Sequence, residues 1–130
     1  MNKTNVIKVF CAVVIILTLS MCSNSAKNMP VAGTDWFNLT MVMNGESILS
    51  NLDFYNNNQC RFVCRTLRND TIHNIEFYYE KNGIIVTLSP LNGGGKWELE
   101  FKNKDNFKFN KTGDIQISDF CSSMGRNQAK

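Results

Sequence analysis

The segment Trp97-Glu98-Leu99-Glu100-Phe101-Lys102 (WELEFK) decides the fold class of this chain. Its large apolar residues alternate with charged ones. This period of two places one face of a β-strand in a core and the other face in water. Between residues 34 and 121 no stretch shows a helical period over more than two turns. The segment therefore predicts a strand within an all-β domain.

The same alternation recurs on both sides of this segment, in further short runs. We expect about eight short strands in total, with the alternating apolar side chains facing the core. Those side chains are Phe37, Leu39, Met41 and Met43; Leu52 and Phe54; Phe62 between Cys60 and Cys64; Ile75, Phe77 and Tyr79; Ile84, Val86 and Leu88; Phe107 and Phe109; and Ile115 and Ile117.

Turn signals separate these runs. Asn44-Gly45 and Asn82-Gly83 are dipeptides typical of two-residue type I′ hairpins. The stretch from Pro90 to Gly95 (PLNGGG) predicts a mobile hairpin loop. Turns spaced about 8 to 12 residues apart favour an antiparallel meander. Closing such a meander into a barrel removes its exposed edges, so we expect a small barrel or a strongly curled sheet.

The N-terminus has the order of a secretory signal sequence. Lys3 and Lys8 supply positive charge, the apolar run Val9 to Leu19 (VFCAVVIILTL) comes next, and small and polar residues follow it. A membrane-spanning helix needs about 20 apolar residues, and this run is roughly half that length. We therefore expect residues 1–21 to form a signal helix that is removed on export.

The run ends in Leu19-Ser20-Met21-Cys22, which resembles the bacterial lipobox. Met21 departs from that pattern, which has Gly, Ala or Ser at this position. The resemblance implies lipidation of Cys22 and a membrane anchor in the cell envelope, at the outer membrane or cell surface. Cleavage after Ser25 by the ordinary signal peptidase is the alternative, and it would give a secreted protein.

Removal of the signal leaves a single small domain. We assign residues 22–33 to a polar tether, residues 34–121 to the β domain and residues 122–130 to a polar tail. Because Lys3 and Lys8 leave with the signal, the formal charge falls from +3 to +1. No basic patch remains, which argues against a nucleic-acid partner. The length suits one core, and we expect a monomer.

A Gly-x-x-Trp opening, Gly33 and Trp36, precedes hairpin segments such as Leu52–Tyr55 (LDFY) and Tyr79–Leu88 (YEKNGIIVTL). Together with the lipobox and the short tether, this arrangement resembles the small lipocalin-like lipoproteins of bacteria. The usual Gly-x-Trp opening of that family is one residue shorter. The resemblance implies a barrel whose interior can hold a small apolar ligand.

Two interpretations of the barrel interior follow. In the first, Trp97, Phe77, Phe101 and Phe107 line a cavity for a small apolar ligand. In the second, which the large size of these residues favours, they and Phe109 simply fill the barrel. A barrel of about eight strands has room for either arrangement.

Three cysteines remain after Cys11 and Cys22 are assigned to the signal and the lipid anchor. Cys60 and Cys64 are four residues apart on one strand, about 13 Å, which is too far for a disulfide between them. In an oxidising compartment either can pair with Cys121, so we consider Cys64–Cys121 and Cys60–Cys121. The alternative is that they are small buried residues. Their spacing is not that of a zinc site.

Catalytic and cofactor motifs are weak. The lone His73 lies in a polar stretch, Arg68 to Asn74, that we expect to be a solvated loop. Glu98 and Glu100 share the polar face of one strand, which favours a solvated face over acid–base chemistry. Gly93 to Lys96 lacks the spacing of a phosphate loop. We expect no metal and no cofactor.

One modification motif lies in the same polar stretch. Asp70-Thr71-Ile72 resembles the O-glycosylation site of some bacteria. The resemblance implies a glycan on Thr71, where an exposed loop would tolerate it.

Three classes of function follow. The favoured one is a non-catalytic, lipid-anchored envelope protein that binds a small apolar ligand or an envelope protein. The second is an envelope inhibitor of a hydrolase such as lysozyme, although no Ser-Gly-rich inhibitory loop is present. The third, and least favoured, is a thiol-dependent enzyme using Cys60, Cys64 or Cys121, which would need a reactive thiol of low pKa.

Overall fold

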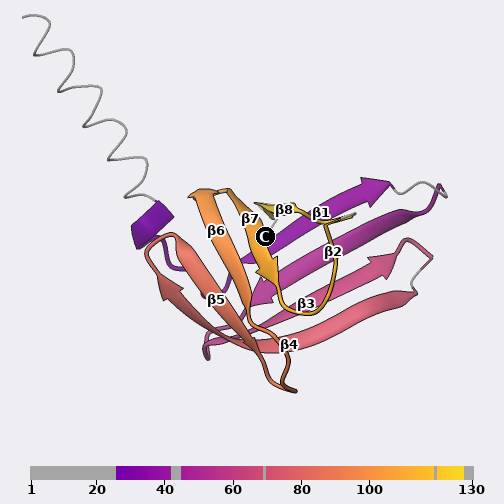
Figure 1. The fold of residues 1–130 in the computed structure, drawn as a ribbon. Coiled ribbons are helices and arrows are strands. Elements are labelled where there is room, and N and C mark those ends of the chain that lie inside the picture. The colour runs from indigo at the N-terminus through magenta and orange to yellow at the C-terminus, as the bar shows by residue number, and fades with distance from the viewer. Residues whose placement is uncertain (1–25, 42–44, 69, 119, 128–130) are drawn as a thin grey trace, which may run out of the picture.

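The computed structural model describes residues 26–41, 45–68, 70–118 and 120–127. In this part of the chain, eight antiparallel strands follow one another around a closed barrel, and the last pairs with the first (Figure 1). The strands are β1 (Asp35–Met41), β2 (Ser47–Phe54), β3 (Gln59–Thr66), β4 (Thr71–Asn82), β5 (Ile85–Pro90), β6 (Trp97–Asn103), β7 (Asn106–Thr112) and β8 (Ser123–Arg126). The predicted all-β meander is confirmed. The predicted signal helix, residues 1–21, lies outside the described residues, as does Cys22.

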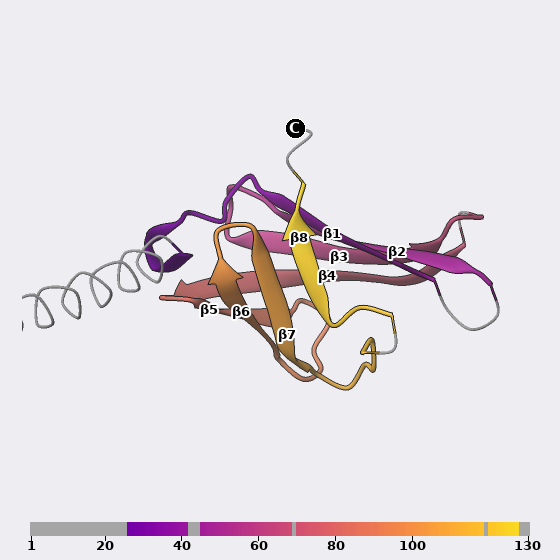
Figure 2. The same ribbon diagram turned by 90° about the horizontal axis from the view of Figure 1, so that it is seen from above.

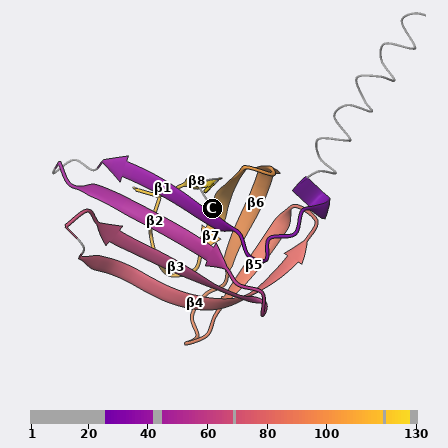
Figure 3. The same cartoon turned by 180° about the vertical axis from the view of Figure 1, so that it is seen from behind.

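The barrel is longer on one side than on the other. Strands β1 to β4 lie side by side as one curved layer (Figure 3). Their hairpins extend past the shorter strands β5 to β8, as the view from above shows (Figure 2). Within the described residues no helix is long and apolar enough to cross a membrane.

The meander gives the barrel two distinct ends. At one end lie residues 26–34 and the turns β2–β3, β4–β5 and β6–β7; we call it the amino end. At the other lie residues 91–96, between β5 and β6, and residues 113–118, after β7; we call it the glycine end. Any site at one end is therefore separated from the other by the length of the strands.

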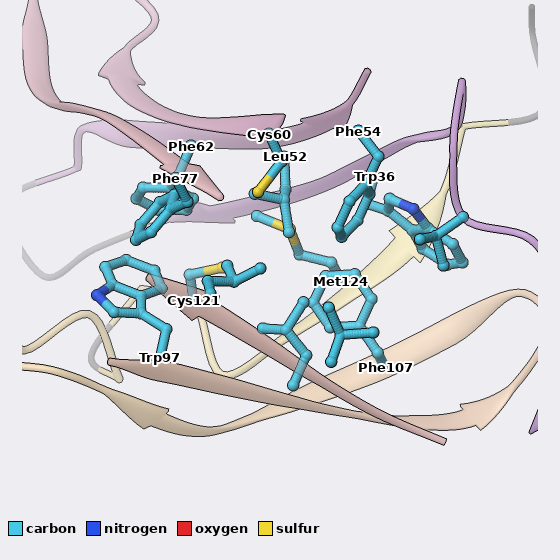
Figure 4. Packing of buried hydrophobic residues seen from close by; sticks show 14 of the residues in the cluster. Trp36, Leu52, Phe54, Cys60, Phe62, Phe77, Trp97, Phe107, Cys121 and Met124 are labelled. Carbon is cyan, nitrogen blue, oxygen red and sulfur yellow. The ribbon is translucent and has the colours of Figure 1, made fainter. Parts of the chain in front are cut away.

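The alternation that predicted β6 sets the core. Trp97, Leu99 and Phe101 are 1%, 0% and 2% exposed, while the glutamates between them lie on the outer face. Alternate residues of the other strands meet them inside the barrel (Figure 4). The largest fully buried side chains are Trp36, Trp97, Phe54, Phe62, Phe77, Phe101, Phe107, Leu52, Leu88, Leu99, Ile117 and Met124.

The predicted facing of β1 is wrong. Phe37, Leu39 and Met41 point outward and are 42%, 57% and 73% exposed. Trp36 is instead buried, with its ring 5.3 Å from that of Phe101. Because neighbouring strand residues face opposite sides, burial of one large ring turns the three smaller apolar side chains to the surface. Met43 lies outside the described residues.

The C-terminal assignments also need correction. Ile115 and Ile117 form no strand, although Ile117 is buried and its carbonyl accepts the backbone N–H of Cys121 at 2.7 Å. The predicted start of the polar tail at residue 122 is also wrong. Residues Ser123–Arg126 form β8, which pairs with β1 and β7 and closes the barrel. Met124 is the buried residue of this strand, at 2% exposure. Four residues with one large apolar side chain are too short to show a period of two.

The predicted tether is largely part of the folded domain. Ala26 and Val31 are 1% and 3% exposed in the core. The Lys81 ammonium donates hydrogen bonds to the carbonyls of Ala26, Lys27 and Gly83, at 3.3, 2.6 and 2.7 Å. These contacts fasten residues 26–34 to the amino end, so only the residues before Ala26 can act as a tether.

The β4–β5 hairpin turns one residue later than predicted. Asn82 pairs with Ile85, which leaves Gly83 and Ile84 as the two loop residues. Gly83 has φ of 62°, and glycine in the first loop position is typical of a type II′ turn. The dipeptide therefore indicates the hairpin correctly but not its turn type. Asn44 of the other predicted turn lies outside the described residues.

Candidate functional site

The predicted ligand-lining residues pack against one another. Trp97, Phe77, Phe101 and Phe107 are each at most 2% exposed. The Phe77 and Trp97 rings are 5.0 Å apart, and those of Phe101 and Phe107 are 5.4 Å apart, both edge to face. These are favourable geometries for aromatic pairs. Their side chains therefore fill the barrel and do not line a cavity inside it (Figure 4).

A small pocket of about 250 Å³ opens at the glycine end, beyond this core. Trp97 is the one predicted lining residue that reaches it. In Figure 4 the indole nitrogen of Trp97 points away from the centre of the core. The pocket is lined by Asn74, Ile75, Pro90, Asn92, Gly93, Gly94, Gly95, Trp97, Asp114 and Ile115.

The pocket lining mixes apolar walls with a few polar groups. Ile75 and Ile115 provide apolar surface, while the Asn74 amide and the Asp114 carboxylate provide donors and acceptors. Small-molecule sites usually enclose about 300–1,000 Å³. This pocket therefore suits a small molecule with both apolar and polar groups, or one protruding side chain of a protein partner, and it is too small for a whole fatty acid.

Gly95, which lines the pocket, and Gly113 come close together where two loops meet beside Trp97. A Cβ placed on Gly113 would lie 2.5 Å from the Gly95 carbonyl oxygen and 3.2 Å from Trp97 Nε1. Gly113 also has φ of 58°, which side chains adopt at a cost. The close backbone approach packs the β5–β6 loop against the start of the β7–β8 connection. Both elements of the pocket therefore depend on Gly113.

Replacing Gly113 with alanine should lower the free energy of unfolding by about 2–4 kcal/mol, because it adds a clash to the cost of a positive φ. Gly93→Ala is the matched control, since Gly93 has φ of 85° but open space around its Cβ position. It should cost about 1–2 kcal/mol. Urea denaturation of the two variants checks this. Equal losses would show that the close approach to Gly95 does not matter.

The three described cysteines are free thiols buried in the core, and the predicted disulfide is not formed in the structure. Burial raises the pKa of Cys121 to about 12 and raises those of Cys60 and Cys64 as well. Cys64 and Cys121 lie close enough for the charge on one to raise the pKa of the other. The Ser50 hydroxyl next to both lowers their pKa values by less than burial raises them. Of the two pairings considered, the electrostatic interaction between Cys64 and Cys121 favours that pair.

His73 belongs to a strand and not to the loop predicted from Arg68 to Asn74. It lies in β4, directly opposite Cys64 of β3. Directly opposite residues on one face have Cβ atoms about 5 Å apart, so a thiol and an imidazole are neighbours here. This pair was not predictable from the sequence, because it depends on the register of two strands. The pKa of Cys64 is nevertheless raised, chiefly by burial, which opposes a nucleophilic thiolate.

Native thiols should not react with a disulfide reagent at pH 8. Their pKa values are raised, so the thiolate fraction is small at this pH and grows only as pH rises toward 12. In a chain of residues 24–130, three thiols should react after unfolding in guanidinium. Titration with Ellman's reagent before and after unfolding checks both statements. One reactive thiol after unfolding would indicate a disulfide. A fast reaction of the native protein would support the alternative of a thiol-dependent enzyme.

The other predicted site residues are spread over the surface. Thr71 is exposed at the start of β4, so it does not lie in the expected loop. Glu98 and Glu100 both interact with the Asn110 amide, at 2.9 and 3.4 Å. The hydrogen bond from Asn110 is the main reason why the pKa of Glu100 is lowered. Glu100 is therefore an ionised carboxylate on the outer face of the barrel. Within the described residues, no three His, Cys, Asp or Glu side chains are grouped to hold a metal ion.

A second, more polar hollow of about 350 Å³ lies at the amino end. Its lining includes the charged residues Asp35, Lys104, Asp105 and Arg126. The strands separate it from the pocket at the glycine end. The two ends of the barrel thus differ in chemistry, one being partly apolar and the other charged.

No protein-family model matches the chain, and neither a curated protein nor a solved structure matches it.

Proposed function

We propose that this chain is a non-catalytic, lipid-anchored protein of the cell envelope that binds a partner at the glycine end of its barrel. The position of the pocket is the observation that supports a binding function. The interior is occupied by side chains, while Trp97 and the Gly93–Gly95 loop form a pocket at one open end. Loops at the end of a rigid barrel are the usual place for binding residues. The lipid anchor rests on Cys22 and its sequence context.

The pocket favours a small molecule with both apolar and polar groups, or a side chain of an envelope protein, over an apolar ligand inside the barrel. The bound group would lie against the edge of Trp97 and within reach of the Asp114 carboxylate and the Asn74 amide. A binding function suits these groups, because they provide recognition without an activated nucleophile. The buried thiols argue against the thiol enzyme, since burial keeps them protonated.

The two tryptophans allow a direct test of this proposal. Trp97 Nε1 lies at the pocket, whereas Trp36 Nε1 donates a hydrogen bond to Thr34 Oγ1, 2.9 Å away, at the amino end. A ¹⁵N-labelled chain of residues 24–130 should be titrated with capped amino acids and N-acetylated sugars. Binding at the pocket should shift the Trp97 indole signal and leave that of Trp36 unchanged.

Asn92→Ala is the matched variant, since Asn92 lines the pocket and is exposed in the loop. It should weaken binding of any probe that shifts Trp97, and it should leave the thermal midpoint unchanged. Shifts confined to Trp36, or no shift of Trp97 by any probe, would count against the glycine end as the binding site.

A further inference from the structure

We propose that the amino end of the barrel rests on the lipid headgroups of the membrane, with Lys27 and Lys104 against the bilayer surface and the Trp97 pocket directed away from it. This inference rests on the proposed lipid anchor and adds an orientation to it. It makes the amino end an interaction surface for one partner, an anionic bilayer. The glycine end is then free to meet partners.

Only a short length of chain separates Cys22 from the folded domain. Ala26 is 1% exposed in the core, so the chain is held in the folded domain at this residue. Cys22 is four residues earlier, and four extended residues span at most about 14 Å. A lipid on Cys22 would therefore hold the amino end within about 14 Å of the headgroups.

Hydrogen bonds attach Ala26 and Lys27 to the barrel. Lys81 binds the carbonyls of Ala26 and Lys27 on one side and that of Gly83 on the other. The Lys27 side chain also lies next to the β4–β5 turn, 3.8 Å from the Cβ position of Gly83. Charge-assisted hydrogen bonds of this kind fix the segment to the turn. Ala26 and Lys27 are thus held against the barrel.

The surface at the amino end carries both basic and apolar side chains. Lys27 and Lys104 are exposed, and the exposed apolar side chains Tyr55 and Ile84 lie on neighbouring turns, at 39% and 37% exposure. Lysine attracts anionic headgroups, at about 1 kcal/mol for each residue near the surface. Tyrosine suits the boundary between lipid and water. Asp35 and Asp105 lie in the hollow beside Lys104, so the hollow itself is not purely basic.

The geometry places the other end well away from the membrane. β5 connects the β4–β5 turn to the glycine end, and its six residues correspond to about 20 Å of strand. Figures 1 and 2 show the short helical turn at residues 26–28 on one side of the molecule, and the end of β1 and the start of β4 on the opposite side. When the amino end touches the headgroups, the second half of β1, with the exposed Leu39 and Met41, and the Trp97 pocket lie farther from them.

The experiment uses the full chain purified from bacterial membranes and two matched labelling variants, Asn56→Cys and Asn92→Cys. Asn56 is exposed at the amino end and Asn92 at the glycine end. Because the native thiols of the barrel are buried, a maleimide fluorophore labels the introduced cysteine. The proteins are placed in vesicles of phosphatidylethanolamine and phosphatidylglycerol that contain a nitroxide-headgroup lipid, and fluorescence quenching is measured.

Quenching should be several-fold stronger at Asn56→Cys than at Asn92→Cys. The double variant Lys27→Glu with Lys104→Glu should reduce quenching at residue 56, whereas Lys96→Glu with Lys111→Glu, at the glycine end, should not. Mass spectrometry of the same samples reports whether Cys22 carries acyl chains. Acylated protein with equal quenching at both positions would overturn the orientation alone, and protein without acyl chains would overturn the lipid anchor together with it.

Discussion

Trp97→Ala should lower the free energy of unfolding by about 3–5 kcal/mol, which is a large part of the stability of a small domain. The ring of Trp97 contacts those of Phe77, Phe62 and Phe109, with centroids 5.0, 5.1 and 5.8 Å apart. Its removal therefore opens a cavity where three rings meet. Aromatic pairs contribute about 0.5–1.5 kcal/mol each beyond their buried area. Guanidinium denaturation followed by circular dichroism measures the loss.

Tyr78→Ala is the control for this substitution. Tyr78 is a large aromatic residue on β4 with 54% of its surface exposed. Its removal leaves no cavity and should change the free energy of unfolding by less than about 0.5 kcal/mol. A small effect of Trp97→Ala, comparable with that of Tyr78→Ala, would show that the barrel is not packed around Trp97.

Cys22→Ser should abolish fatty-acid labelling and move the protein from the membrane fraction to the soluble fraction. The lipobox resemblance places the acyl chains on this thiol, and no other lipid attachment is proposed. Anchoring by several acyl chains is much stronger than that of a single chain, so the change should be close to complete. Radiolabelled palmitate and fractionation of cell envelopes measure the two effects.

Cys11→Ser is the matched control, because Cys11 lies in the apolar run of the signal and outside the lipobox. It should label and fractionate like the natural chain. Equal labelling of the natural chain and Cys22→Ser would rule out the lipobox. Export of a soluble chain that begins after Ser25 would support the ordinary signal peptidase instead.

The fold was predictable wherever one strand face is fully apolar. In β6 the alternation is complete, and the structure buries the expected face. In β1 the alternation predicts the wrong buried face. Three apolar residues, Phe37, Leu39 and Met41, share one face, but the structure buries Trp36 on the other. Which of two faces turns inward depends on partners from distant strands, here Phe101 and Phe107. A single sequence holds that information only indirectly.

Only part of the candidate site was predictable. The loop from Pro90 to Gly95 and its neighbour Trp97 were recognised from local composition. Asn74 and Asp114 complete the pocket from two other connections, and nothing in their local sequence marks them. The same is true of Cys64 opposite His73, a pair that depends on the register between β3 and β4. Contacts between distant segments arise from closure of the barrel and not from local patterns.

The position of the binding site depends on a filled barrel, and a fatty-acid titration tests this most directly. In a Trp36→Phe background, Trp97 becomes the only tryptophan, and its fluorescence reports on both the core and the pocket. A fluorescent fatty acid added to residues 24–130 should give no saturable quenching in the micromolar range, because the Trp97 ring is surrounded by other rings. Saturable sub-micromolar quenching would contradict the account, since it would show that the barrel opens to hold an apolar ligand.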